Sequence, residues 1–253
     1  METIPCIRIS GTSCEPATFD AAAEAPLALF VNGRHITTLL ISPGMERELV
    51  VGFLVTEQIV GSETEIESMR FETNRASVLT TNPFKIPTGK KTVLSGCGGS
   101  TSYIDTAKLP SVASPFSVGA GAVAAAAAAV LAHEPEASAR GAVCAGLARD
   151  GEILYYNEDI GRDNALDRLI GWGVLGHLDF SRSVAVTSAA ITSEAVRKCL
   201  VAGISVLVSS GAATGLAVAT AQATGLCLIA GLKDGIMQVL SRPERITGCN
   251  RER

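Results

Sequence analysis

A single cysteine lies in a run of glycine and serine near the middle of the chain. Cys97 is flanked by Gly96, Gly98 and Gly99, so no neighbouring side chain blocks the approach of a partner to its sulfur. Successive backbone N–H groups in such a loop can form a concave anion site that favours thiolate over thiol. Because the thiolate is the nucleophile, Cys97 is the first candidate for covalent chemistry. The alternative is an incidental thiol in a flexible loop.

Two further segments combine glycine with charged residues. Residues 158–167 (EDIGRDNALD) follow a predicted strand, and ligands of α/β sheets bind beyond the carboxyl ends of strands, often at helix N-termini. Arg162 could hold a phosphate or carboxylate there, or could instead form a structural ion pair with Asp159 and Asp163. Asp163 could also cap the following helix. Residues 231–236 (GLKDGI), taken alone, are typical of a turn between two strands.

The sequence lacks the motifs of several other reaction classes. The three histidines lie far apart, without the spacing of a metal site. The zinc deaminase signature, the G-x-S-x-G elbow, the Walker motif and G-x-G-x-x-G are absent. The seven cysteines include no C-x-x-C pair, so we expect reduced thiols in a cytoplasm. The six cysteines other than Cys97 are expected to be buried or inert.

Composition excludes some kinds of partner. The net charge is −4 and basic residues are not clustered, so nucleic-acid binding is not expected. No apolar run reaches the roughly 18 residues of a membrane span, the alanine-rich stretch 120–132 included. The N-terminus has no basic region followed by an apolar core, so secretion is not expected.

The hydrophobic pattern predicts a small β-rich N-terminal domain over residues 1–81. Asn32-Gly33 is a strong hairpin signal between strands at 26–31 and 35–41. Ser42-Pro43 is expected to open a helix, with Glu57 on its outward face. Residues 63–81 suggest short β structure. Residues 82–114 are expected to form a mobile loop that carries Cys97, because the stretch to residue 117 is long and rich in glycine, proline and serine.

From residue 115 to 253 the pattern predicts an α/β domain. A helix is expected at 117–133, a hairpin around Asp150-Gly151, and a helix over about 165–174. Strands at 183–187, 204–209 and 226–230 then alternate with helices at 193–202 and 214–224, before a last strand at 237–240. Short, fully apolar strands in such alternation favour a largely parallel sheet covered on both faces.

Segments from residue 24 to 246 together resemble the formate dehydrogenase accessory sulfurtransferase (FdhD) family. Any one segment would be weak, but their order and spacing make the likeness specific. In chain order they are Pro26-Leu27, Val31-Asn32-Gly33, Ser42-Pro43, residues 51–57 (VGFLVTE), Ser95-Gly96-Cys97-Gly98, residues 158–167, Ala202-Gly203-Ile204, Leu216-Ala217 and residues 243–246 (PERI).

The resemblance implies a cytoplasmic homodimer whose C-terminal domain has a cytidine-deaminase-like α/β fold without the deaminase site. It implies that a cysteine desulfurase donates sulfur to Cys97 as a persulfide. The acceptor would be the molybdenum or tungsten bis-pterin guanine dinucleotide cofactor of formate dehydrogenase, bound transiently, with no permanent cofactor. The residues that would contact it are Gly161, Arg162, Asn164, Asp167, Gly231, Leu232, Lys233, Asp234, Gly235 and Ile236.

The chain departs from the family pattern at polar positions. Ser100 replaces the second cysteine of a C-x-x-C pair, so a persulfide on Cys97 has no local thiol to resolve it. Asp163 and Cys144 stand where the family has histidine, and Ala189 and Ile236 where it has arginine. These changes weaken the expectation of tight binding to an anionic cofactor.

The leading hypothesis is persulfide transfer through Cys97. The metal of the acceptor, or a distant thiol such as Cys144, would then drive release of the sulfur. One rival hypothesis is a cofactor chaperone that binds the pterin dinucleotide without sulfur chemistry. Another is a metabolic enzyme on the same scaffold, for which Asp163 and Cys144 would be gained functional groups.

Overall fold

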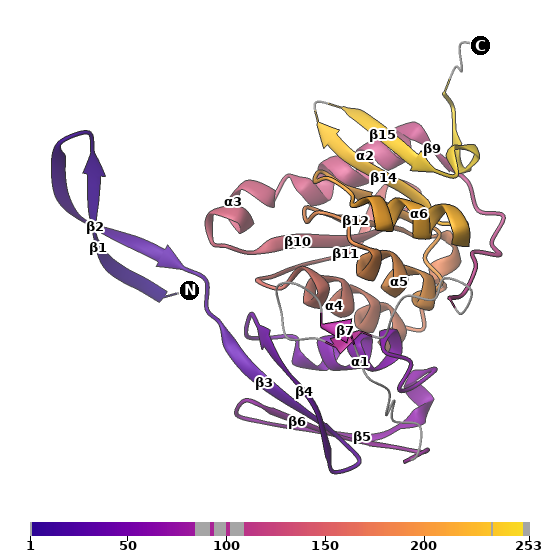
Figure 1. The fold of residues 1–253 in the computed structure, drawn as a ribbon, viewed down its shortest axis with the longest axis horizontal. Helices are drawn as coiled ribbons and strands as arrows, with labels where there is room; N and C mark the ends of the chain where they lie inside the picture. Colours follow the sequence, from indigo (N-terminus) through magenta and orange to yellow (C-terminus); the bar gives the residue numbers. More distant parts are fainter. Residues whose placement is uncertain (1, 84–91, 94–99, 102–108, 234, 250–253) are drawn as a thin grey trace.

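A six-stranded sheet covered by helices on both faces carries the C-terminal half of the chain (Figure 1). The computed structural model describes residues 2–83, 92–93, 100–101, 109–233 and 235–249. The order of the strands is β11-β10-β12-β13-β14-β15. Their bounds are β10 Val143–Arg149, β11 Glu152–Asp159, β12 Val184–Thr187, β13 Val206–Ser209, β14 Cys227–Lys233 and β15 Ile236–Ser241.

The prediction of a largely parallel sheet is wrong. In this sheet only the pairs β12–β13 and β13–β14 are parallel, and the other three pairings are antiparallel. The reason is that the outer two strands on each side of the sheet are joined by a tight hairpin. Asp150 and Gly151, both with positive φ, join β10 to β11 as the sequence predicted, and the turn at Gly235 joins β14 to β15. Two-residue turns can connect only antiparallel strands.

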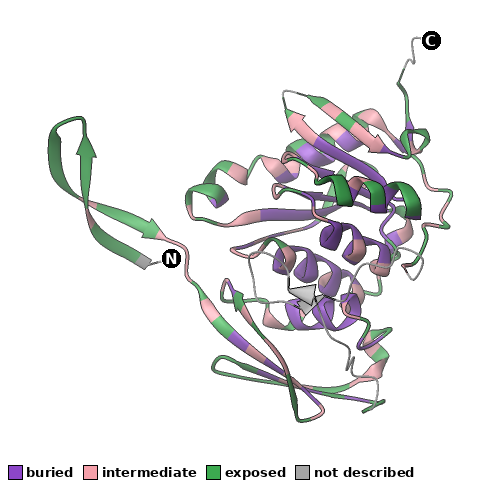
Figure 2. Ribbon diagram, viewed as in Figure 1, coloured by how far each residue is buried: buried purple, intermediate pink, exposed green. Residues whose placement is uncertain are grey.

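Alternation along the strands sends side chains to two cores. Ala185, Leu207 and Leu228 face one core, and Val186, Val208 and Ile229 face the other, so both faces of the sheet are buried (Figure 2). Helices α4 Arg162–Leu175, α5 Ser193–Ala202 and α6 Gly215–Thr224 cover the first face, and α2 Ala120–Leu131 and α3 Glu134–Ala139 cover the second.

The N-terminal unit is a four-stranded sheet with one helix. Asn32 and Gly33 form the predicted hairpin turn with positive φ. The helix begins at Glu46, not at Pro43, because Gly44 and Met45 both have positive φ, which a right-handed helix cannot contain. The elements are β3 Ala25–Val31, β4 Arg34–Ile41, α1 Glu46–Thr56, β5 Ile66–Glu72 and β6 Arg75–Thr80, and the strand order is β4-β3-β6-β5.

Several short elements complete the chain. A hairpin of β1 Glu2–Ser10 and β2 Ser13–Ala21, which the sequence analysis missed, projects from the body (Figure 1). The segment from 82 to 114, expected to be a mobile loop, lies mostly outside the described residues, and Cys97 with it. The remaining elements are η1 Glu63–Glu65, β7 Thr92–Val93 paired with β8 Ser100–Thr101, β9 Val118–Gly119 paired with β16 Ile246–Thr247, η3 Phe180–Arg182 and η4 Pro243–Arg245.

Two glycines bring α1 and α4 into backbone contact. A Cβ atom at Gly52 would lie 1.7 Å from the Asp167 carbonyl oxygen, and one at Gly171 would lie 1.8 Å from that of Glu48. Helix axes can approach this closely only where no side chain intervenes. The two predicted domains therefore share one continuous hydrophobic core.

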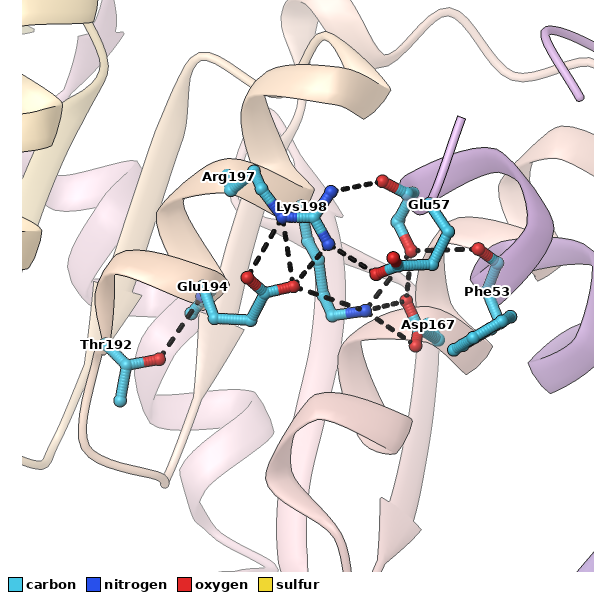
Figure 3. Close-up of polar contacts among 9 residues, drawn as sticks. Phe53, Glu57, Asp167, Thr192, Glu194, Arg197 and Lys198 are labelled. Atoms are coloured by element: carbon cyan, nitrogen blue, oxygen red, sulfur yellow. Dashed lines mark hydrogen bonds and ion pairs between the residues drawn. The ribbon is translucent and has the colours of Figure 1, made fainter. Parts of the chain in front are cut away.

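A buried group of ions joins α1, α4 and α5 at this contact (Figure 3). Lys198 donates to both carboxylate oxygens of Asp167 at 2.8 Å, and the Thr56 hydroxyl also donates to that carboxylate at 2.8 Å. Burial raises the pKa of the Asp167 carboxyl to about 6, although Lys198 and Thr56 oppose the shift. At neutral pH the carboxylate is therefore ionised and depends on Lys198 for its partner.

The prediction that Glu57 lies on the outward face of its helix is wrong. Instead of facing solvent, Glu57 accepts from Arg197 at 2.5 Å, and Arg197 also donates to Glu194. The side chains of Arg197 and Glu57 are each only 14% exposed. Burial alone would lower the pKa of Arg197, but its two carboxylate partners raise it.

We predict that Lys198→Met lowers the free energy of unfolding by about 3–5 kcal/mol, because it leaves the Asp167 carboxylate buried without a cation. The double variant Lys198→Met/Asp167→Asn should recover much of this loss. Urea unfolding followed by circular dichroism measures both. Arg70→Ala is the matched control, because it breaks an exposed ion pair with Glu72 and should cost no more than about 1 kcal/mol. A loss for Lys198→Met as small as for this control would contradict the prediction.

Candidate functional site

The carboxyl ends of the three parallel strands β12, β13 and β14 lie at the same end of the central sheet, which we call the sheet edge. β12 ends at Thr187, which lies opposite Ser209 at the end of β13. β11 also ends at this edge, at Asp159, opposite the start of β10. The chain therefore brings to this edge the loops 188–192 and 210–214, the turn at 231–235 and the start of α4. Ligands of α/β sheets bind in this position.

The loops at this edge are tied to one another through their backbones. The Ser209 hydroxyl donates to the Ala189 carbonyl at 2.6 Å and accepts from the Gly211 amide at 2.8 Å. The Gly231 amide in turn donates to the Gly211 carbonyl at 2.8 Å. A Cβ atom at Gly211 would lie 3.0 Å from the Ala190 nitrogen, so glycine permits this close approach. The edge is therefore a connected backbone surface.

Asp159 holds the start of α4 in place. It is fully buried and lies 2.7 Å from the Arg168 guanidinium. It also accepts from the Gly161 amide at 2.7 Å and from the Asn164 side chain at 3.0 Å. Burial raises the pKa of the Asp159 carboxyl, and these contacts oppose the shift. The ion pair considered between Asp159 and Arg162 is therefore formed by Arg168 instead, and the Arg162 side chain is exposed.

The residues around Arg162 differ in whether they are buried or accessible. Gly161 is the N-cap of α4, and no side chain caps the helix, so the cap expected from Asp163 is absent at this described helix start. The Asp163 oxygen Oδ1 is buried and has no hydrogen-bond partner among the described residues. Asn164 turns inward and donates to the Leu40 carbonyl at 2.7 Å, and Asp167 joins the buried ions described above. Of the four residues of this motif that were expected to contact the cofactor, Gly161 and Arg162 are not buried, whereas Asn164 and Asp167 are.

The second predicted segment forms the turn between β14 and β15. Gly231 and Gly235 both have positive φ, Lys233 is exposed and Ile236 is 70% exposed. β14 lies four strands from β11, so at about 4.8 Å per strand the two segments are roughly 19 Å apart. The structure thus brings both segments to one edge but separates them. Leu232 is half-buried, and Asp234 lies outside the described residues.

A polar chain that the sequence analysis did not identify lies beside this edge. The Cys144 sulfur lies 3.2 Å from the Tyr156 hydroxyl, which donates to Glu158 at 2.7 Å, and Arg140 pairs with Glu158. The register of the predicted hairpin, with Cys144 opposite Glu158, could have found it, since Tyr156 and Glu158 share a face. Cys144 is fully buried, and burial raises the pKa of its thiol, although Tyr156 opposes the shift.

Within the described ranges, no three His, Cys, Asp or Glu side chains gather in a way that could hold a metal ion. A separate search of the same residues finds no helix with the length and apolarity needed to span a membrane.

Comparisons with known proteins agree over nearly the whole chain. The sequence profile of the FdhD/NarQ family matches residues 22–247. The sulfur carrier protein FdhD of Mycolicibacterium paratuberculosis is 31% identical over 247 residues, which cover 88% of this chain and 90% of that protein. The sulfur carrier protein FdhD of Mycobacterium tuberculosis is 33% identical over 256 residues, with 89% and 91% covered.

A solved structure shares the fold. The crystal structure of a candidate formate dehydrogenase accessory protein from Desulfotalea psychrophila superposes with a TM-score of 0.80 at 23% identity, and the match covers 97% of this chain and 98% of that one. The mixed α/β fold with its separate sheets is therefore shared, and the profile match extends over nine-tenths of the residues. The chain belongs to the FdhD/NarQ family.

Proposed function

We propose that this protein is a sulfur carrier for the maturation of formate dehydrogenase. In this proposal a cysteine desulfurase donates sulfur to Cys97, and the acceptor is the molybdenum or tungsten bis-pterin guanine dinucleotide cofactor. The relatives named as sulfur carriers support the role, because they match about nine-tenths of their own length. We further propose a cytoplasmic homodimer and a cytidine-deaminase-like description of the C-terminal unit.

The observation that carries the proposal is the shared sheet edge. The start of α4 and the turn at 231–235 open on the same side of the molecule. An anionic dinucleotide that extends across the edge would meet the positive end of the α4 dipole and Arg162 at one end. It would meet Lys233 at the other. In this arrangement Gly161, Arg162, Gly231, Lys233 and Gly235 contact the acceptor, whereas Asn164 and Asp167 position α4 from the interior.

Sulfur transfer proceeds in two steps, and a cysteine thiolate leaves in each of them. The Cys97 thiolate attacks the outer sulfur of the donor persulfide, a new S–S bond forms on Cys97, and the donor cysteine leaves as its thiolate. At the acceptor, a metal centre in its reduced form would supply two electrons, the S–S bond would break, the terminal sulfur would remain on the acceptor as sulfide, and Cys97 would return as a thiolate. With Ser100 in place of a second cysteine, no local disulfide competes with this release.

The alternative is a chaperone that binds the cofactor without sulfur chemistry. Two observations favour it: Ser100 removes one of the family's two thiols, and the buried Cys144 thiol is not accessible to replace it. The chaperone would use the same sheet edge, so binding at the edge does not separate the two functions. Persulfide formation does.

We expect incubation with a cysteine desulfurase and cysteine to add about 32 Da, one sulfur atom, to the wild-type chain. Intact-mass spectrometry measures the adduct, and Cys97→Ala should abolish it. Cys14→Ser is the matched control, because Cys14 is an exposed thiol far from the edge, and it should leave the adduct unchanged. An adduct that persists in Cys97→Ala would refute the role of Cys97. No adduct in wild type, with guanine nucleotide still bound, would favour the chaperone.

We predict that Arg162→Ala weakens the binding of GDP, used as a probe, by about tenfold or more, because it removes a charge-assisted hydrogen bond to a phosphate at the start of α4. Isothermal calorimetry measures the dissociation constants. Arg70→Ala removes an exposed arginine on β5, remote from the edge, and is the control. Equal binding by wild type and Arg162→Ala would contradict the assignment of this end of the edge.

We expect Cys144 to be protected from alkylation in the folded protein, because its thiol is buried and its pKa is raised. With iodoacetamide at pH 8, Cys249, which is exposed, should react first, and Cys144 should react only after unfolding. Peptide mass mapping over time measures the order. Rapid labelling of Cys144 would instead make it available as a second sulfur-handling thiol.

A further inference from the structure

The projecting hairpin is a regular, tightly closed structure. β1 and β2 pair over their full length, from Glu2 opposite Ala21 to Ser10 opposite Ser13. Gly11 and Thr12 form the two-residue turn, and Gly11 has φ of 61°, as the first central residue of a type II′ turn requires. We call residues 2–21 the arm.

Among the described residues, none buries the arm against the body of the protein. No residue from 3 to 21 is buried, and the arm contributes nothing to either hydrophobic core (Figure 2). Its large apolar side chains face solvent: Ile4 is 45% exposed, Phe19 56%, Ile7 62% and Ile9 68%. An isolated two-stranded hairpin is marginally stable in water. The arm therefore needs a surface outside its own chain to cover it.

Both faces of the arm carry apolar residues. Cross-strand partners lie on the same face, so Ile7 and Ile9 share one face with their partners Pro16 and Cys14 near the tip. Ile4 shares the opposite face with its partner Phe19, closer to the body. A single flat contact would cover only one of these patches. The covering surface must enclose the arm or contact it on both sides.

Proline blocks both free edges of the arm. In a two-residue hairpin the pair next to the turn, Ser10 and Ser13, is hydrogen-bonded, and bonded and non-bonded pairs then alternate. The pairs Pro5–Thr18 and Ile7–Pro16 fall in the non-bonded class, whose backbone groups point outward. Proline has no N–H to offer there, so each edge lacks one of its outward donors, which disfavours strand addition. The faces of the arm are therefore the better docking surface.

The area of the arm decides between a single docking event and an exchange. Nine residues extend about 30 Å and two strands are about 10 Å wide, so each face offers roughly 300 Å². One arm inserted into a partner contributes about 600 Å² at most, below the roughly 800 Å² per partner of a standard interface. Reciprocal exchange between two copies doubles the contact, because each copy gives one arm and receives another.

We propose that the arm packs through its two faces onto a second copy of this chain, in a reciprocal exchange. The proposal deepens the homodimer given under the proposed function, since it names the surface that forms it. The match to the solved relative covers 97% of this chain, which includes most of the arm. The arm is therefore part of the shared fold, although it precedes the residues that the family profile matches.

The double variant Ile7→Asp/Ile9→Asp tests this surface. Sedimentation velocity should show a dimer for wild type at micromolar concentration and a monomer for the variant, with a dimer dissociation constant at least about 100-fold weaker, because two buried isoleucines are lost from each arm. Thr12→Asp, which places the same charge in the turn beyond the apolar patches, is the control and should remain dimeric. The thermal unfolding midpoint measured on monomeric samples should not change, because the arm does not pack on its own body.

A second measurement does not depend on the folding of the double variant. A photo-cross-linking residue, Thr18→p-benzoylphenylalanine, should join differently tagged copies of the full chain on irradiation. An unchanged dissociation constant for Ile7→Asp/Ile9→Asp, or no cross-link between copies, would overturn the exchange. A monomeric wild type would overturn the homodimer as well. The Cys97 persulfide, measured on the same samples, reports separately on the sulfur carrier function.

Discussion

The buried Arg168 guanidinium is the interaction on which the arrangement of the candidate site depends. It pairs with Asp159 at the end of β11 and donates to the Ser42 and Gly44 carbonyls in the loop before α1. Three parts of the chain that are distant in sequence thus meet on one cation. Replacing Arg168 with a neutral side chain would leave Asp159 buried without a charge partner, and removal of one member of such a pair commonly costs about 3–5 kcal/mol. The pair therefore couples the N-terminal unit to the sheet edge.

This coupling determines which residues of the α4 motif are accessible at the sheet edge. Asp159 is occupied by Arg168, Gly161 and Asn164, and Asp167 by Lys198 and Thr56. With these two carboxylates held inside, Arg162 is the fully exposed side chain of the motif, beside the half-buried Gly161. The polar side chains of this ten-residue motif thus have two roles. Most of them orient α4, and few can contact a substrate.

Local signals in the sequence predicted local structure well. Asn32-Gly33 and Asp150-Gly151 both form the predicted hairpins, because their positive φ values depend on the residues themselves. Buried charge pairs were not predictable, since Glu57 and Arg197 are 140 residues apart and either side chain alone is typical of an exposed helix face. The arm was missed for a similar reason: proline and charged residues interrupt its isoleucines, and its apolar side chains alternate between two faces without a core.

The small number of cationic side chains at the candidate sheet edge has a consequence for the strength with which it would bind an anionic acceptor. Of the polar residues that the family resemblance led us to expect, the edge retains Arg162 and Lys233, and Ala189 and Ile236 stand where the family has arginine. In the proposed function, an arginine–phosphate contact contributes about 1.5–3 kcal/mol of binding free energy, so an edge without two such contacts binds an anionic acceptor at least about a hundredfold more weakly. A carrier must release its cargo in every cycle, whereas a storage protein must not. Arg168 and Lys198 hold the edge in place through their buried ion pairs with Asp159 and Asp167. We infer that an edge with so few cationic side chains favours exchange of the acceptor over its retention.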